Sequence, residues 1–132
     1  MENSPRTVLL VDDSLMFRKL LGDLFRDLGA VEVVEVASGR AALEHLAGAP
    51  RPDLVCVDLV LPDVSGFDVC THIRSTPALT DLPVLVVSSR HQPEDKARAE
   101  RAGATGYLSK PFTVEDFGTH VHRVMGASLD RE

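Results

Sequence analysis

Four short apolar runs, each followed by polar residues, constrain the fold of this 132-residue chain more than any other feature. The runs are residues 8–11 before Asp12 and Asp13, 54–57 before Asp58, 84–87 before Ser88, and 106–109 before Lys110. Runs of this length and β-branched content are typical of strands buried on both faces, as in parallel sheets. Because parallel strands all end at one edge, we expect the carboxylates, the hydroxyl and the lysine to meet there.

Helical patterns separate the predicted strands, and this alternation places the chain in the α/β class. Helices are predicted over residues 14–28, 38–47, 66–74, 93–102 and from 113 onward, and a further strand over 31–36. The buried stripe of the first helix is predicted to contain Phe17, Leu20, Leu21, Leu24 and Leu28. Strands and helices joined by right-handed crossovers build one sheet with helices on both faces. The sequence therefore predicts a five-stranded parallel sheet, with a short strand at residues 107–108 near one edge.

Composition limits the partners that this chain can have. It carries 14 basic and 20 acidic residues, and the net charge of −6 argues against nonspecific binding to nucleic acid or anionic lipid. No apolar stretch approaches the roughly 20 residues that a membrane span needs, and the first residues lack a signal-peptide core. We therefore expect a cytoplasmic single domain over residues 1–132, with a core at about 6–126 and a short polar C-terminal tail.

The predicted cluster at the strand ends has the chemistry of a phosphate and metal site. Asp12, Asp13 and Asp58 would repel one another as ionised neighbours, and a hard divalent cation such as Mg²⁺ removes that conflict. Lys110 supplies a point positive charge suited to a phosphoryl oxygen, and the Ser88 hydroxyl can donate to another. Together these residues predict a carboxylate that attacks phosphorus and becomes an acyl phosphate.

Four sequence blocks resemble the signature blocks of response-regulator receiver domains. They are VDDS at 11–14, VDLVLPDVSG at 57–66, PVLVVS at 83–88 and GATGYLSKPF at 103–112. The resemblance covers about residues 6–126 and implies a flavodoxin-like (βα)5 fold. It also implies a phosphoacceptor response regulator of the single-domain, chemotaxis-regulator-like type, acting in a two-component or phosphorelay pathway. Such a domain is not an enzyme, except that it catalyses its own phosphorylation and dephosphorylation.

The same resemblance implies a role for each residue of the cluster. Asp58 would be the phosphoacceptor, and Asp12 and Asp13 would organise Mg²⁺ together with Asp58. The backbone carbonyl of Val60 would be a further metal ligand, which its apolar side chain does not impair. Lys110 would contact the phosphoryl group.

Ser88 and Tyr107 would form a conformational switch, again by resemblance. The Ser88 hydroxyl would move to bind the phosphoryl group, and the Tyr107 ring would turn inward to fill the vacated space. Considered alone, Tyr107 has a second interpretation, in which the ring simply packs on the edge of the sheet.

The resemblance implies protein partners as well. Asp58 would receive its phosphoryl group from a sensor histidine kinase or a histidine phosphotransfer protein, docked on the first helix after Ser14 and the loop around Pro111. A downstream protein would bind the surface formed by the fourth helix, the fifth strand and the fifth helix. Neither nucleic acid nor membrane is an expected partner.

Two positions bear on the lifetime of the phosphoryl group. Val60 and Arg90 stand two residues after Asp58 and Ser88, where side chains of the resembled family flank the path of the attacking water. The bulky apolar Val60 and the long Arg90 are predicted to hinder water and to lengthen the phosphoryl lifetime.

Two other interpretations are compatible with the residues, and a third is disfavoured by them. A receiver-like fold can act as a phosphorylation-independent interaction module, although such modules typically lose part of the acidic cluster. The chain could be a receiver fragment of a larger regulator or hybrid kinase, since residues 127–132 are polar and suit the start of a linker. A phosphatase with an aspartate nucleophile would need a second acid two residues after Asp58, where this chain has Val60.

Overall fold

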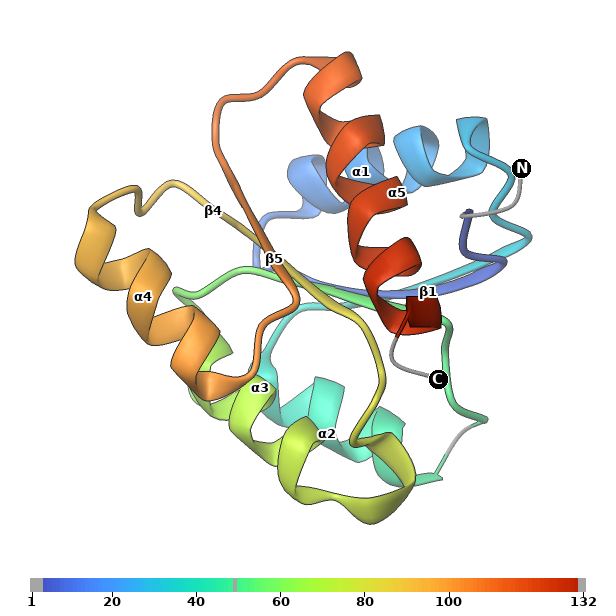
Figure 1. The fold of residues 1–132 in the computed structure, drawn as a ribbon. Coiled ribbons are helices and arrows are strands. Elements are labelled where there is room, and N and C mark those ends of the chain that lie inside the picture. The colour runs from blue at the N-terminus through green and yellow to red at the C-terminus, as the bar shows by residue number, and fades with distance from the viewer. Residues whose placement is uncertain (1–3, 49, 131–132) are drawn as a thin grey trace.

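A computed structural model describes residues 4–48 and 50–130 and shows, within them, five parallel strands alternating with five α-helices (Figure 1). The strands are β1 (Thr7–Val11), β2 (Glu32–Val36), β3 (Leu54–Val57), β4 (Val84–Ser88) and β5 (Gly106–Ser109). The helices are α1 (Leu15–Asp27), α2 (Gly39–Gly48), α3 (Gly66–Ser75), α4 (Pro93–Ala102) and α5 (Val114–Asp130), and a 3-10 helix spans Pro77–Leu79. The predicted α/β class and the five-stranded parallel sheet are confirmed.

The order of the strands decides which strand ends become neighbours. The sheet has the order β2-β1-β3-β4-β5, so β1 pairs directly with β3, and β5 lies at an edge as predicted. In this pairing Val11 lies opposite Val57. The residues that follow them, Asp12 and Asp58, therefore leave the sheet side by side.

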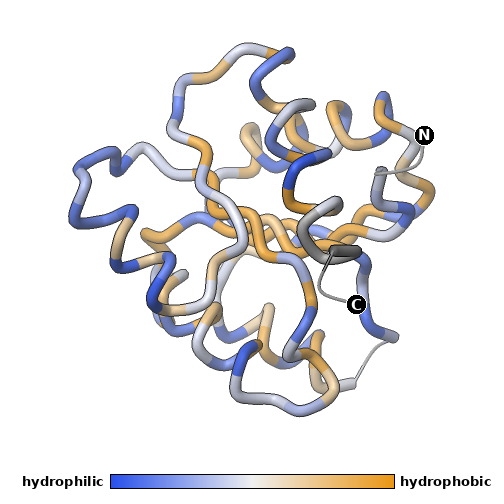
Figure 2. Tube along the Cα trace, in the orientation of Figure 1, coloured by the Kyte–Doolittle hydropathy of each residue, from blue (hydrophilic) through white to orange (hydrophobic). Residues whose placement is uncertain are grey.

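Helices cover both faces of the sheet, which explains why its strands are almost continuously apolar. α1 and α5 pack on one face, and α2, α3 and α4 pack on the other (Figure 1). The strands form the most hydrophobic segments of the chain and run through the middle of the molecule (Figure 2). In β1, for example, Leu9 belongs to the core under α2 and α3, whereas Leu10 belongs to the core under α1 and α5.

Capping residues set the helix ends close to the predicted positions. Ser14 Oγ accepts a hydrogen bond from the backbone N of Phe17 at the start of α1, at 3.2 Å. Thr113 Oγ1 accepts one from the backbone N of Asp116 at the start of α5, at 3.0 Å. Gly103 ends α4 with a φ of 113°, in the left-handed region that favours glycine.

The buried face of α1 differs from the prediction at two positions. Leu20 is 49% exposed, whereas Phe25, which the predicted stripe left out, is fully buried. The buried face centres on Leu21 and Phe25, which lie one helical turn apart and both point at the sheet. Leu20 therefore lies beyond the margin of that face. The partly buried members of the stripe are Phe17, Leu24 and Leu28.

The last helix extends beyond residue 126, where the predicted core ends. α5 continues to Asp130, so residues 127–130 of the predicted polar tail are helical, and residues 131 and 132 lie outside the described residues. A glycine inside a helix costs only about 1 kcal/mol relative to alanine, so Gly126 does not end α5. Neither α5 nor any other helix within residues 4–48 and 50–130 is long and apolar enough to cross a membrane.

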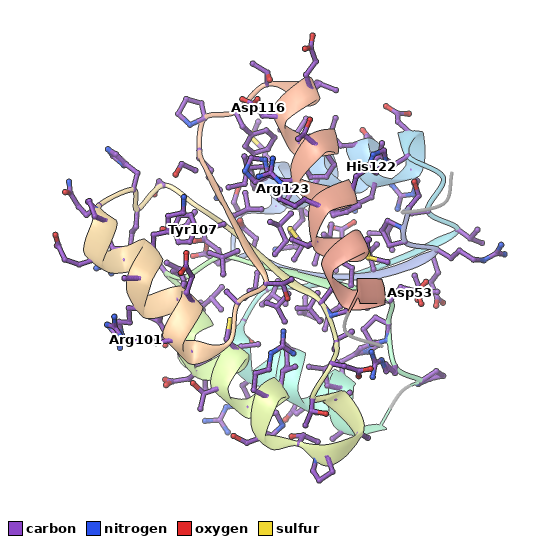
Figure 3. The ribbon with its side chains drawn as sticks, in the orientation of Figure 1. Asp53, Arg101, Tyr107, Asp116, His122 and Arg123 are labelled. Carbon is purple, nitrogen blue, oxygen red and sulfur yellow. The ribbon has the colours of Figure 1, made fainter. Side chains whose placement is uncertain are left out.

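Side chains of α4, β5 and α5 share one edge of the molecule. Arg101 lies near the end of α4, Tyr107 lies on β5, and Asp116 lies at the start of α5 (Figure 3). This edge is the surface that the sequence predicted for a downstream partner.

Candidate functional site

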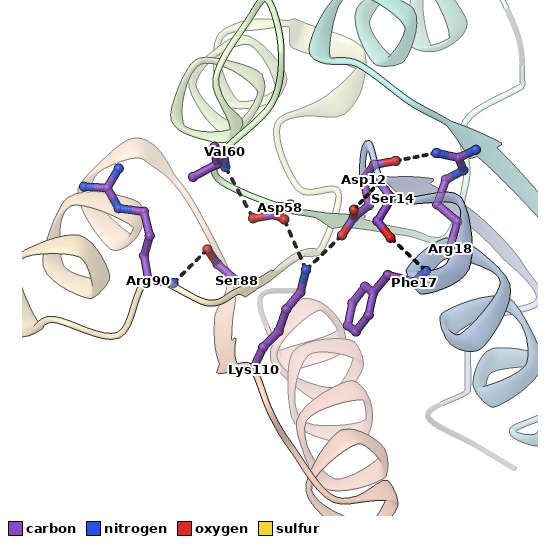
Figure 4. Close-up of polar contacts among 9 residues, drawn as sticks. All are labelled: Asp12, Ser14, Phe17, Arg18, Asp58, Val60, Ser88, Arg90 and Lys110. Carbon is purple, nitrogen blue, oxygen red and sulfur yellow. Dashed lines mark hydrogen bonds and ion pairs between the residues drawn. The ribbon is translucent and has the colours of Figure 1, made fainter.

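Asp12, Asp58 and Lys110 meet at the carboxyl edge of the sheet (Figure 4). The Lys110 Nζ lies 3.1 Å from Asp12 Oδ2 and 3.2 Å from Asp58 Oδ2. Asp12 follows β1, Asp58 follows β3 and Lys110 follows β5, so each comes from a different part of the chain. The parallel arrangement of the strands brings the three together.

The environment of Lys110 keeps its side chain cationic. Burial opposes the charge, but the hydrogen bond to Asp12 and the negative charges of Asp58 and Asp12 outweigh burial and raise the pKa of the ammonium group above its ordinary value. One lysine neutralises one of the two carboxylates. The pair of aspartates with Lys110 therefore retains a net negative charge.

The second oxygen of each carboxylate is held by the backbone. Asp12 Oδ1 accepts a hydrogen bond from the backbone N of Ser14 at 2.8 Å, and Asp58 Oδ1 accepts one from the backbone N of Val60 at 3.3 Å. In both cases the aspartate side chain accepts a hydrogen bond from the backbone N two residues further along the chain, which is the arrangement of an Asx turn. Each carboxylate thus has one oxygen on the backbone and the other on Lys110, which fixes its orientation.

The residues at this edge fit a hard divalent cation by their donor chemistry. Asp12 and Asp58 are mostly buried, whereas Asp13, the residue that follows Asp12, is exposed. Mg²⁺ usually takes one or two carboxylates and completes its shell with carbonyl, water and phosphate oxygens. Within the described residues no three His, Cys, Asp or Glu side chains form a ready metal-binding group. A cation here would therefore depend on backbone, water or phosphate oxygens, such as the predicted Val60 carbonyl.

Ser88 and Tyr107 are joined through the backbone of Arg90. Ser88 is fully buried at the end of β4, and its Oγ accepts a hydrogen bond from Arg90 N at 3.2 Å. The Tyr107 ring points inward with 8% exposure, and its hydroxyl donates to the carbonyl of Arg90. Burial, aided by the charge of Asp95, raises the pKa of the Tyr107 phenol above its ordinary value. Tyr107 is thus a neutral hydrogen-bond donor, a role that packing on the sheet edge does not require.

Arg18 and Glu35 support the Asp12 loop, and no sequence pattern predicted this role for them. Arg18 Nη1 donates to the backbone carbonyl of Asp12 at 2.7 Å (Figure 4). Arg18 Nε lies 3.2 Å from Glu35 Oε1. Lys19 Nζ lies 3.0 Å from the other oxygen of Glu35. Arg18 is on α1 and Glu35 is on β2, so their contact depends on how the helix lies on the sheet. A charged residue in a helix carries no signal of such a partner.

The doubly wound parallel sheet is a flavodoxin-like α/β fold, and its carboxyl edge carries an acidic site with a lysine. The family model of the response regulator receiver domain matches residues 8–122. The chain belongs to the response regulator receiver domain family of two-component signalling.

Three similar proteins are each matched over at least 90% of their length. The polar-differentiation response regulator DivK of Brucella anthropi is 33% identical over 122 residues, which cover 92% of this chain and 98% of that protein. The structure of chemotaxis protein CheY4 of Vibrio cholerae is 34% identical in sequence and has a TM-score of 0.82. The match covers 89% of this chain and 97% of that one. The structure of the Mn²⁺-bound form of response regulator Rcp1 is 28% identical, with a TM-score of 0.75. That match covers 89% of this chain and 90% of the Rcp1 chain. These matches confirm the flavodoxin-like receiver fold.

Proposed function

We propose that this protein accepts a phosphoryl group on Asp58, with Mg²⁺ bound beside it, and signals by binding another protein. The observation that carries the proposal is the position of Lys110 Nζ between the carboxylates of Asp58 and Asp12. A cation beside the reacting carboxylate neutralises the charge that a phosphoryl group brings. Family membership supports the reaction class, and the Mn²⁺-bound Rcp1 structure supports a divalent metal.

The proposed transfer uses groups that stand at this edge of the sheet. An Asp58 oxygen attacks phosphorus and forms a P–O bond, while the bond from phosphorus to the donor's histidine nitrogen breaks. The electron pair stays on that nitrogen, which takes up a proton. Lys110 and the Ser88 hydroxyl would each hold one phosphoryl oxygen. Mg²⁺, held by Asp12, Asp13, Asp58 and the Val60 carbonyl, would supply further charge neutralisation when bound.

Labelling by a small phosphodonor tests the proposal. After incubation with Mg²⁺ and acetyl phosphate, intact-protein mass should show one added phosphoryl group on the wild type and none on Asp58→Asn. Asp53→Asn is a matched control, because Asp53 precedes the same strand, accepts from the backbone N of Arg6 and Thr7, and should leave labelling unchanged (Figure 3).

Two results would contradict this assignment. Equal labelling of Asp58→Asn would move the phosphoacceptor elsewhere. An unlabelled wild type would favour the interaction module that works without phosphorylation.

The proposed switch would connect the phosphoryl group to the output surface through Arg90. In the structure Tyr107 is inward, the position that the switch assigns to the phosphorylated protein. Tyr107 is the single tyrosine of a chain without tryptophan, so intrinsic fluorescence reports on its surroundings. We expect acetyl phosphate to change this fluorescence in the wild type and not in Ser88→Ala. If the fluorescence of the fully labelled wild type is unchanged, Tyr107 is not part of a switch and only packs on the sheet.

Exposed apolar side chains support docking of the phosphodonor on α1. Leu15, Met16 and Leu20 of α1 are exposed, and we call them the α1 patch. α1 and α5 pack on the same face of the sheet, next to Lys110. A cytoplasmic histidine kinase or histidine phosphotransfer protein would bury this patch.

A charge placed in the α1 patch separates docking from chemistry. Met16→Asp should slow phosphotransfer from a histidine kinase that labels the wild type, while labelling by acetyl phosphate should keep its rate. Asp23→Asn, at an exposed position further along α1, serves as the control. Equal slowing with both donors would mean that the substitution disturbs the site itself.

The phosphoryl lifetime is proposed to depend on Val60 and Arg90. The Val60 side chain is 55% exposed beside Asp58, where it can shield the phosphoryl group from water. The Arg90 guanidinium is tied to Asp95, with Nη2 2.8 Å from Asp95 Oδ1, so its shielding depends on that pair. Val60→Asn should therefore shorten the lifetime, measured by the decay of the phosphorylated mass. An unchanged or longer lifetime would reject the role of Val60.

A further inference from the structure

The ring of Phe17 covers the side of the Lys110 ammonium group that the carboxylates leave open. Lys110 Nζ lies 3.8 Å from the centroid of the Phe17 ring, in addition to its contacts with Asp12 and Asp58 (Figure 4). An ammonium group has three N–H donors, of which two are used by the carboxylates. We propose that Phe17 is a positioning residue that holds the Lys110 ammonium beside Asp58 by a cation–π interaction. This role rests on the proposed phosphorylation of Asp58.

Phe17 is itself held by the surrounding structure. Its backbone N donates to the capping oxygen of Ser14, and its ring makes an edge contact with Phe112, with centroids 6.0 Å apart. Phe112 in turn stacks on Phe117 of α5 at 5.8 Å. The ring therefore moves little without breaking several contacts, and it limits where the lysine can swing.

The partial burial of Lys110 increases the weight of this contact. The Lys110 side chain is 20% exposed, so little water is available to solvate the third N–H. The negative face of an aromatic ring stabilises a cation more strongly as water is excluded. An aliphatic side chain at position 17 would leave that N–H facing hydrocarbon. Lys110 would then be held less firmly where it must meet the phosphoryl oxygen.

Two substitutions separate the charge effect from packing. Phe17→Leu removes the ring, and replacement of Phe17 by trifluorophenylalanine keeps the ring shape while weakening the negative potential of its face. The same fluorinated residue at Phe25 is the control, because Phe25 packs on Phe117 at 4.8 Å in the core under α1 and α5. If Phe17→Leu fails to fold, the protein with trifluorophenylalanine at position 17 still tests the proposal.

The first measurement does not depend on phosphorylation. In the metal-free wild type, the Lys110 ε-methylene protons should show an upfield ring-current shift in the NMR spectrum, and Phe17→Leu should lose it. An unshifted wild-type resonance would overturn the proposal, even if labelling by acetyl phosphate is normal.

The second measurement is the rate of labelling by acetyl phosphate at subsaturating donor. We expect about a fivefold lower rate for Phe17→Leu, an intermediate rate for the fluorinated Phe17, and the wild-type rate for the fluorinated Phe25. Wild-type rates in both Phe17 proteins would reject the positioning role while leaving the proposed function intact. An unlabelled wild type would instead reject the proposed function, and the ring-current shift would still decide whether Phe17 holds Lys110.

Discussion

Two aspartates flank β3, and their neighbours give them different roles. Asp53 precedes the strand, and its Oδ2 accepts from the backbone N of Arg6 and Thr7 at 2.9 and 3.1 Å. Asp58 follows the strand and shares Lys110 with Asp12. Asp53 therefore attaches the N-terminal segment to the sheet, while Asp58 stands where a ligand can reach it. The direction of the strands, which the sequence pattern predicted, separates the two aspartates.

At the residue scale, we predict that Glu35 stabilises the fold in a pH-dependent manner. Burial opposes the charge of Glu35, but hydrogen bonds and positive charge from Lys19 and Arg18 outweigh it and lower the pKa of the carboxyl group below its ordinary 4.5. A lowered pKa means that the stabilisation is fully present above the ordinary value and is lost as pH falls through the folded-state value. Urea unfolding should therefore show Glu35→Gln to be less stable than the wild type at about pH 7, with the difference shrinking toward about pH 3.

Glu32→Gln is the control for this measurement, because Glu32 is exposed on the same strand. A stability difference for Glu35→Gln that stays constant across this pH range would show that the ion pairs with Arg18 and Lys19 are not its source.

At the element scale, the loop between β3 and α3 is held tightly against its neighbours. A Cβ on Gly66 would lie 2.2 Å from the carbonyl oxygen of Asp58, so only glycine fits there. Earlier in the loop, Asp63 Oδ1 accepts from the backbone N of Gly39 at 3.1 Å and caps α2. The loop that follows Asp58, the proposed phosphoacceptor, is thus attached to both α2 and α3.

Alanine substitutions at two helical glycines should have opposite effects. Gly66→Ala should destabilise the protein by about 1–3 kcal/mol and slow labelling, because the new Cβ meets backbone that cannot move aside. Gly118→Ala should stabilise it by about 0.5–1 kcal/mol, since Gly118 lies within α5 and its Cβ would meet open space. Denaturant unfolding of both variants measures these changes. A neutral Gly66→Ala would contradict the close approach.

At the scale of the whole molecule, the sheet order gathers charge from distant parts of the chain. β1 and β3 are neighbours although a strand and two helices separate them in sequence, and their carboxyl ends place Asp12 and Asp58 together. Negative charge therefore accumulates at one edge of a chain whose net charge is already −6. A cation bound at that edge would stabilise the folded state relative to the unfolded chain.

We predict that Mg²⁺ raises the stability of the wild type through Asp13 and Asp58. At ten times its dissociation constant, Mg²⁺ should add about 1.4 kcal/mol to the free energy of unfolding, measured at constant ionic strength. Asp13→Asn should lose most of this gain, whereas Asp23→Asn, which removes one exposed charge elsewhere, should keep it. An equal gain in Asp13→Asn would exclude Asp13 from the metal site.

Local patterns were enough to predict the strands and most helix ends. The apolar runs, the Ser14 and Thr113 caps and Gly103 are signals that act within a few residues, and the structure has them where they were predicted. The convergence of Asp12, Asp58 and Lys110 followed from one further rule, that parallel strands end at a common edge.

The amino-acid sequence by itself thus determined the α/β sheet and the identity of its strand-end residues, because periodicity and polarity act locally. Only the tertiary structure decided that Phe17 faces Lys110, that Arg18 supports the Asp12 carbonyl, and that Leu20 is exposed while Phe25 is buried. These outcomes depend on the rotation of α1 about its axis and on its position over the sheet. Both are set by packing against residues far away in sequence, which no local pattern records.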